Sequence, residues 1–227
     1  MLGKFFIVAT PIGNLDDISK RALETLKSVD FILAEDTRVT KKLFAKYEIK
    51  KPMLTYNQHT YKDSNKTRSI IARILSGESA ALVTDAGTPG ISDPGNELVD
   101  MLLEYERDVQ IIPIPGPSAL VAALSVCGFD VSHFSFVGFM PKRKRNKLVA
   151  ELLGRGEAFV YFDSPHRVVK NLELITELGG DGRRVFVGRE LTKLHETHYR
   201  GNISHVIAEL KSSDPRGEVV VVVEKKV

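Results

Sequence analysis

The chain has 227 residues, of which 43% are hydrophobic and 27% charged, and its formal net charge is +3. This length allows one large domain or two small ones, and no apolar stretch approaches the roughly 20 residues that a membrane-spanning helix needs. The single cysteine, Cys127, excludes an intramolecular disulfide and cysteine-rich metal sites. We therefore expect a cytoplasmic protein with no metal and no membrane association.

The first half of the sequence alternates short apolar runs with amphipathic segments. The apolar runs have the length of buried strands and lie at 5–8, 31–34, 53–56, 80–83 and 109–112. Helical spacing of apolar residues is found between them, at 16–29, 39–47, 67–75 and 97–105. Such alternation predicts a mainly parallel sheet covered by helices on both faces.

A proline-rich connector divides the sequence. Residues 113–117 contain three prolines and one glycine, a composition typical of a stiff linker. We expect an N-terminal α/β domain over residues 1–115 and a C-terminal α/β domain over 116–227. In the second half, strands are expected at 134–139, 158–162, 185–187 and 217–224, and helices at 119–126, 147–153, from 165 onward and at 204–210.

Residues with chemically useful side chains or flexible backbones follow three strands of the first half. They are Pro11, Gly13 and Asn14 after the first strand, Glu35, Asp36 and Arg38 after the second, and Asp85, Gly87 and Ser92 after the fourth. Because the carboxyl ends of parallel strands share one edge, these loops are expected to converge on one crevice. Residues 82–95 include three glycines, which let the backbone approach a ligand closely. Asp85 either binds ribose hydroxyls or a cation, or forms an Asx turn that only shapes the loop.

A basic run marks the second half. Five of the six residues from 142 to 147 are basic, namely Lys142, Arg143, Lys144, Arg145 and Lys147. Such a run is either a solvated loop or a clamp on the phosphates of a nucleic acid. Composition alone does not distinguish a solvated loop from a phosphate clamp. The chain also lacks the glycine motifs of dinucleotide-binding and P-loop enzymes and the Gly-x-Ser-x-Gly of hydrolases, which disfavours those classes.

Several blocks spread along the chain form a recognisable series. They are IVATPIGNL at 7–15, AEDTR at 34–38, VTDAGTPGISDPG at 83–95, PIPGPSAL at 113–120, GFMP at 138–141, SPHR at 164–167, GRELTK at 188–193 and GE at 217–218. Together they resemble the tetrapyrrole-methylase superfamily, and within it the branch that methylates a cytidine 2′-oxygen in small-subunit (16S) ribosomal RNA. The resemblance covers nearly the whole sequence.

The resemblance implies two α/β domains of the tetrapyrrole-methylase type, with S-adenosylmethionine in the cleft between them, and a homodimer. By motif position, it implies cofactor contacts from Pro11, Asp85, Ala86, Gly87, Pro115, Ser118 and Phe162. It also implies substrate-side or supporting roles for Glu35, Asp36, Arg38, Arg167, Arg189 and Glu190, without identifying the general base. The basic run would hold the RNA backbone, and the need for a 2′-hydroxyl argues against DNA as a substrate.

Two features depart from the family pattern. Members commonly carry glutamate where this chain has Asp163, and many continue into a small C-terminal helical domain, whereas this sequence ends at Val227. The RNA partner is expected to be small-subunit ribosomal RNA or the assembled subunit. The alternatives are an enzyme of the same fold that methylates a porphyrin-like acid, and a noncatalytic RNA-binding module.

Overall fold

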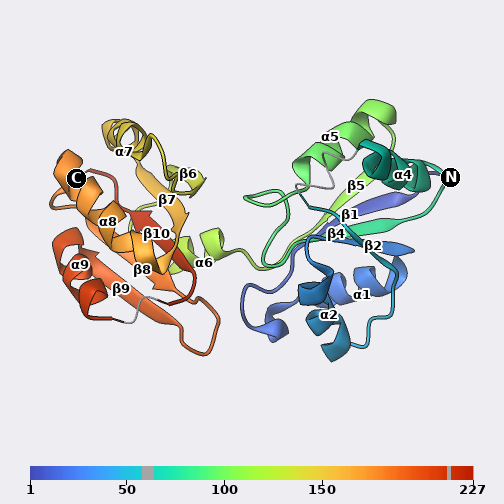
Figure 1. Cartoon of the computed structure of the whole chain (residues 1–227), viewed down its shortest axis with the longest axis horizontal. Helices are drawn as coiled ribbons and strands as arrows, with labels where there is room; N and C mark the ends of the chain where they lie inside the picture. The colour runs from blue at the N-terminus through green and yellow to red at the C-terminus, as the bar shows by residue number, and fades with distance from the viewer. Residues whose placement is uncertain (58–63, 214–215, 227) are drawn as a thin grey trace. The chain divides into compact units, whose positions relative to one another are not determined.

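The computed structural model describes residues 1–57, 64–213 and 216–226. The chain forms two compact units, Met1–Ser118 and Ala119–Val227 (Figure 1). The expected boundary, after residue 115, lies three residues earlier than this division. In the part of the chain that the structure describes, no helix combines the length and the apolar character that crossing a membrane would require.

The first unit is built on a parallel five-stranded sheet with the strand order β3-β2-β4-β1-β5. Its strands are β1 (Lys4–Val8), β2 (Phe31–Ala34), β3 (Met53–Thr55), β4 (Ala80–Val83) and β5 (Gln110–Ile114). Its helices are η1 (Leu15–Asp17), α1 (Lys20–Ser28), α2 (Thr37–Lys46), α4 (Ser64–Leu75) and α5 (Asn96–Tyr105). Every residue of β2 and β4 is buried, as their uninterrupted apolar sequences predict.

Helices cover both faces of this sheet (Figure 1). On one face, apolar residues of α1 and α2, such as Leu26 and Leu43, pack with Val8 of β1. On the other face, residues of α4 and α5, such as Ile74 and Leu98, pack with β1, β2 and β4. The predicted parallel sheet between two helical layers is therefore confirmed, and it places the carboxyl ends of β2, β4 and β1 side by side.

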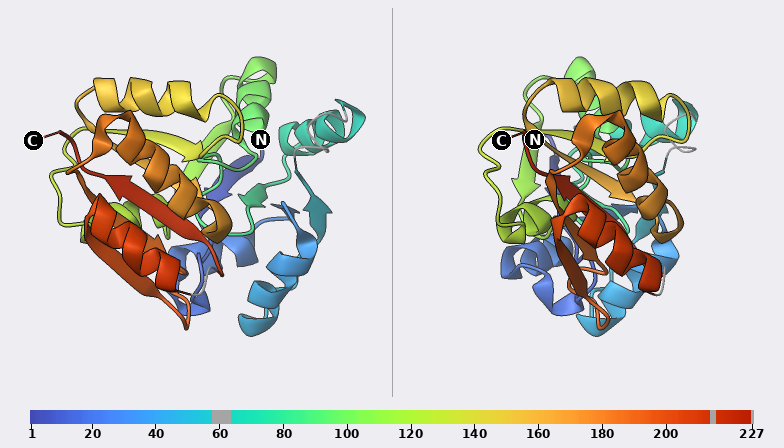
Figure 2. Two further views of the ribbon diagram at one scale, coloured as in Figure 1. Left: turned by 60° about the vertical axis from the view of Figure 1, so that its left-hand side comes forward. Right: turned by 90° about the vertical axis from the view of Figure 1, so that its left-hand side faces the viewer.

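The second unit contains a mixed sheet with the order β6-β7-β10-β8-β9, in which only β6 and β7 pair in parallel. Its strands are β6 (Phe134–Phe139), β7 (Ala158–Asp163), β8 (Arg184–Arg189), β9 (Thr197–Asn202) and β10 (Val219–Val223). Its helices are α6 (Ala119–Val126), α7 (Arg145–Gly154), α8 (Pro165–Ile175), η2 (Thr176–Gly180) and α9 (Ile203–Ser212). Figure 2 shows α7, α8 and α9 along one side of this sheet, and their apolar residues form its main core.

Two differences from the sequence-based expectation concern whole elements. The single helix expected at 16–29 is wrong, because Ile18 is extended and the Ser19 hydroxyl starts a new helix by accepting a hydrogen bond from Ala22 N. The strand β9 was not expected at all. Its sequence, THYRGN, has no alternating apolar residues, and only Tyr199 is buried.

Candidate active site

The loops that follow β1 and β4 are tied together through their backbones. Thr10 N donates a hydrogen bond to Gly87 O at 2.8 Å, and Gly87 N donates to Thr10 O at 3.1 Å. The Thr10 hydroxyl also donates to Thr84 O at 3.0 Å. Gly87 has a φ of +81°, a conformation that favours glycine. These bonds fix the path of the Gly/Pro-rich loop against the start of the loop after β1.

Two carboxylates link the loops that follow β2 and β4. Asp36 N donates a hydrogen bond to Asp85 Oδ1 at 3.1 Å, and Asp85 N donates to Glu35 Oε2 at 3.3 Å. The side chains of Glu35 and Asp85 therefore lie next to each other at the carboxyl edge of the sheet. Glu35 is half-buried and Asp85 is exposed at the surface of the loop. Loss of hydration beside the neighbouring chain is the main cause that raises the pKa of each carboxyl group, and the nearby negative charges raise it further.

Asp36 has a different environment from these two carboxylates. Its side chain caps the start of α2 by accepting a hydrogen bond from Arg38 N at 2.8 Å, and the Arg38 guanidinium donates to both of its oxygens. The side-chain bonds from Arg38 lower the pKa of Asp36 to about 2. Asp36 therefore remains ionised and engaged, which suits an orienting group better than a base.

The connector lies against the same loops. Ala9 N donates to Ile114 O at 3.2 Å, and the Thr88 hydroxyl donates to Pro117 O at 3.1 Å. A Cβ atom added to Gly116 would lie 3.0 Å from Ala9 Cβ. The residues predicted to contact a cofactor in the first unit thus come from three segments that the structure holds together: Pro11, Asp85, Ala86, Gly87, Pro115 and Ser118.

Glu190 lies in a braced loop of the second unit. It follows β8 and has a left-handed backbone with a φ of +52°. Its Oε1 accepts hydrogen bonds from Lys193 Nζ at 2.8 Å and from Glu218 N at 2.7 Å. Burial disfavours its negative charge, but these donors outweigh burial and lower its pKa. Arg189 braces the same loop by donating to Arg216 O at 2.9 Å and to Thr197 Oγ1 at 3.2 Å.

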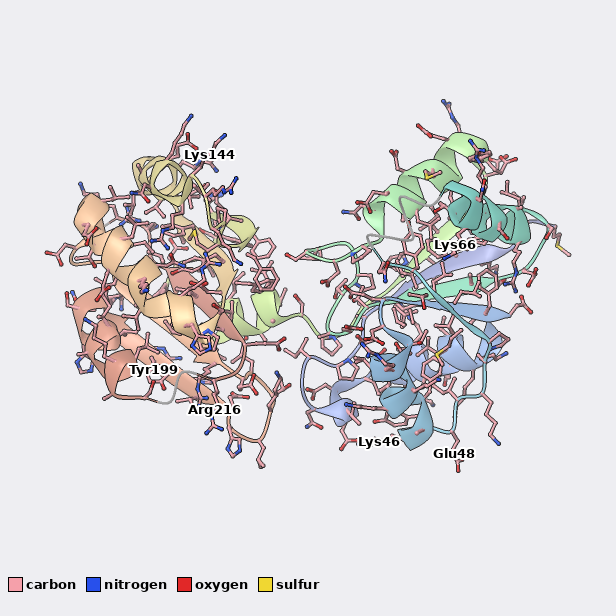
Figure 3. The ribbon with its side chains drawn as sticks, in the orientation of Figure 1. Lys46, Glu48, Lys66, Lys144, Tyr199 and Arg216 are labelled. Carbon is pink, nitrogen blue, oxygen red and sulfur yellow. The ribbon has the colours of Figure 1, made fainter. Side chains whose placement is uncertain are left out.

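The basic run spans a turn and the first turn of α7, so its expected placement in a loop is only partly correct. Lys144 precedes the helix with a left-handed φ of +57° (Figure 3). Lys142, Arg143, Lys144 and Lys147 are exposed. Arg145 is instead half-buried, and its Nη1 donates to Asn171 Oδ1 at 3.1 Å. Arg145 therefore anchors the run from within the unit.

A buried polar network around Asn171 fixes the position of Arg145. Asp163 is 3% exposed and Asn171 fully buried, and Asn171 Nδ2 donates to Asp163 Oδ2 at 2.5 Å. Ser164 N donates to the other oxygen at 2.9 Å, and Arg167 donates to Met140 O at 2.7 Å. Burial raises the pKa of Asp163. Sequence reasoning did not identify Asn171, although a lone amide on the apolar face of α8 was a usable signal.

Replacing Asn171 with leucine is expected to destabilise the protein by roughly 2–4 kcal/mol, because the substitution leaves the Asp163 carboxylate buried without its closest side-chain donor. The folded state already binds the Asp163 proton more tightly than the unfolded state, and the lost donor strengthens this preference. The destabilisation should therefore be larger at pH 8 than at pH 5 in urea unfolding. The exposed substitution Asn146→Leu is the control. Equal stability of the two variants, or a loss independent of pH, would contradict this account.

Phe162 belongs to an aromatic cluster near the end of β7. Its ring meets those of Phe136 and Phe139 edge to face, at centroid distances of 5.1 and 5.5 Å. Phe162 is half-buried, whereas Phe139 is 65% exposed. The cluster thus presents apolar surface at the carboxyl end of this strand.

Comparisons with known proteins agree on the family and on the fold. A family model for Tetrapyrrole (Corrin/Porphyrin) Methylases matches residues 4–207. Ribosomal RNA small subunit methyltransferase I of Thermotoga maritima is 45% identical over 99% of this chain and 100% of its own. The protein of the same name from Bacillus subtilis is 42% identical over 98% of this chain and 75% of its own.

Solved structures resemble the chain at much lower identity. The cobalt precorrin-4 methyltransferase CbiF has a TM-score of 0.71 at 18% identity, covering 97% of this chain and 94% of that one. The methyltransferase CobJ has a TM-score of 0.67 at 16% identity, covering 98% and 94%. These similarities show the fold alone, and they confirm the fold class that the sequence predicts.

Proposed function

Because the chain belongs to the tetrapyrrole (corrin/porphyrin) methylase family, we propose that it transfers a methyl group from S-adenosylmethionine to a cytidine 2′-oxygen in small-subunit ribosomal RNA. The observation that carries the proposal is the 45% identity to a named ribosomal RNA methyltransferase over essentially the full length of both chains. A porphyrin-like substrate has weaker support, since the similarity to corrinoid enzymes is 16–18%. A noncatalytic role is disfavoured by the methyltransferase names of the relatives.

The residues of the first unit fit such a cofactor chemically. S-adenosylmethionine supplies a methyl group on a sulfonium, which is an already activated donor. Gly87 and Gly116 keep the region free of bulk, and the buried Thr84 hydroxyl has no hydrogen-bond partner among the described residues. The exposed Asp85 offers a carboxylate to ribose hydroxyls or to a positive charge. Phe162, in the second unit, remains a predicted apolar contact for S-adenosylmethionine.

We assign the general base to Glu35. A 2′-hydroxyl is a poor nucleophile until its proton is withdrawn, and an effective base has a pKa near the working pH. Asp36 and Glu190 have lowered pKa values and are engaged by Arg38 and Lys193, respectively. Glu35 has a raised pKa, and among the described residues its side chain accepts one long hydrogen bond, from Asp85 N at 3.3 Å. Arg38 and Arg189 act as positioning residues in this proposal.

The exposed part of the basic run is expected to bind the RNA backbone. The triple variant Lys142→Gln, Arg143→Gln, Lys144→Gln should weaken RNA binding and reduce the slope of log K against log salt by about 2, at roughly 0.7 per lost contact with a single strand. Arg145 is left unchanged because its guanidinium is bonded to the buried Asn171. The triple variant Lys4→Gln, Lys20→Gln, Lys27→Gln, on exposed residues of the first unit, removes the same charge and is the control. If the two variants have equal salt slopes, the basic run does not bind the RNA backbone.

The proposed partner is small-subunit ribosomal RNA, either free or within the assembled subunit, and this substrate is consistent with a cytoplasmic location. We also propose a homodimer, which the exposed apolar side chains of α6, Val121 and Val126, support. The test of substrate class is incorporation of a labelled methyl group into unmodified small-subunit RNA, with uroporphyrinogen as the parallel substrate. Labelling of the porphyrinoid alone would overturn the proposal.

A further inference from the structure

A second basic surface lies in the first unit, apart from the run at 142–147. Between residues 38 and 51 the sequence holds six basic side chains and a single acid, Glu48. Two of the basic residues have partners: Arg38 binds Asp36, and Lys46 binds Asp16 at 2.5 Å. The other four form no ion pair with any residue in the described ranges: Lys41, Lys42, Lys50 and Lys51. Ion pairing within the described residues therefore does not account for these four cations.

Three of these lysines line a groove of about 740 Å³ at the C-terminal end of α2. The lining residues are Lys41, Phe44, Ala45, Glu48, Ile49, Lys50, Lys51 and Met53. Lys41 and Lys50 are exposed, whereas Phe44 and Ile49 are 4% and 6% exposed. Figure 3 marks Lys46 and Glu48 at this end of the helix. The groove thus combines an apolar floor with a rim that carries three positive charges and one negative charge.

We propose that this groove binds a single-stranded segment of the RNA substrate. The lysines of the rim would contact phosphates, and the apolar floor would contact a base or sugar. Sites that bind single-stranded nucleic acids with little sequence preference track the backbone with a basic groove and hold the bases on aromatic side chains. This groove shares the basic path, and its apolar contacts come from the exposed Ala45 and the half-buried Met53 beside the edge of the core at Phe44. An RNA segment is favoured over a protein partner because the rim carries a net positive charge and the lysines lack partners. The inference rests on the proposed function.

The position of the groove suits a strand that also passes the candidate base. Helix α2 starts directly after Asp36, and its ten residues span about 15 Å. The groove lies at the other end of the same helix. At roughly 3.4 Å per stacked nucleotide, this length corresponds to about four nucleotides. One strand could therefore reach both the carboxyl edge of the sheet and the groove.

The experiment measures the affinity of poly(U) RNA for the full chain at several salt concentrations. The triple variant Lys41→Gln, Lys50→Gln, Lys51→Gln should bind at least about tenfold more weakly, and its salt slope should fall by about 2. The control is again Lys4→Gln, Lys20→Gln, Lys27→Gln, which removes an equal charge from the same unit and should retain the wild-type slope. Melting temperature and S-adenosylmethionine affinity should be unchanged in both variants.

A second test removes a negative charge from the groove instead of a positive one. Glu48→Gln keeps the size of the side chain and the same left-handed backbone, with a φ of +53°, and removes the one negative charge of the groove. It should tighten RNA binding a few-fold. Equal salt slopes for the groove variant and its control, or unchanged RNA affinity of Glu48→Gln, would show that RNA does not bind this groove. The proposed function would still stand. Absence of RNA binding and of RNA methylation by the wild type would instead overturn the proposed function.

Discussion

Replacing Glu35 with glutamine is expected to lower kcat by roughly 100- to 10,000-fold, which is the usual contribution of a general base. Glutamine preserves the size of the side chain and an oxygen that can accept the bond from Asp85 N. S-adenosylmethionine affinity should therefore remain near the wild-type value. Single-turnover methylation at saturating cofactor and RNA measures the chemical step. Glu104→Gln, an exposed substitution on α5, is the matched control.

The pH profile separates a base from a merely structural carboxylate. Burial raises the pKa of Glu35 above its usual value of 4.5. The wild-type rate should fall as the pH drops through this raised pKa, because the protonated carboxyl group can no longer accept the hydroxyl proton. The variant should lack this acid limb. If Glu35→Gln keeps a near-normal kcat or an intact acid limb, the general base is another group.

Replacing Asp85 with asparagine is expected to weaken S-adenosylmethionine binding by roughly 10- to 100-fold, since a hydrogen bond to a charged group contributes about 1.5–3 kcal/mol. Asparagine can still accept the hydrogen bond from Asp36 N, so the loop should keep its path and the melting temperature should not change. Calorimetric titration with the cofactor measures the effect. The exposed Asp100→Asn removes the same charge from α5 and should leave affinity unchanged.

Asp85→Ala provides the complementary comparison. It removes both the charge and the acceptor for Asp36 N, so it should also lower stability slightly. If Asp85→Asn binds cofactor normally while Asp85→Ala does not, the aspartate shapes the loop through its hydrogen bond and does not act through its charge. Unchanged cofactor affinity in both variants would remove Asp85 from the cofactor site.

The short apolar runs predicted the strands of the first unit, whereas helical periodicity alone merged η1 and α1 into one helix. Sequence reasoning also predicted that the loops after β1, β2 and β4 converge, which the Thr10–Gly87 and Asp36–Asp85 contacts confirm. The end of β5 was less clear, since Pro113 suggested a linker. The structure places Pro113 within β5, at the edge of the sheet, where a missing N–H is tolerated.

The remaining features depend on tertiary contacts that leave little local signal. β9 is polar and owes its conformation to pairing with β8. Sequence grouped Arg145 with its basic neighbours, but only the fold brings it to Asn171. Glu35 and Asp36 are adjacent in sequence, but their pKa values move in opposite directions. Burial raises the pKa of Glu35, and the hydrogen bonds from Arg38 lower the pKa of Asp36. The basic groove likewise depends on how α2 and the segment leading to β3 pack together.

Nucleoside analysis of methylated RNA tests the central claim most directly. Unmodified small-subunit RNA, free and in assembled subunits, would be incubated with the protein and labelled S-adenosylmethionine, digested to nucleosides and separated by mass spectrometry. The account predicts that the label is recovered as 2′-O-methylcytidine and that Glu35→Gln abolishes most of it. Label on a base, or no label in either RNA substrate while a porphyrinoid acceptor is methylated, would contradict it.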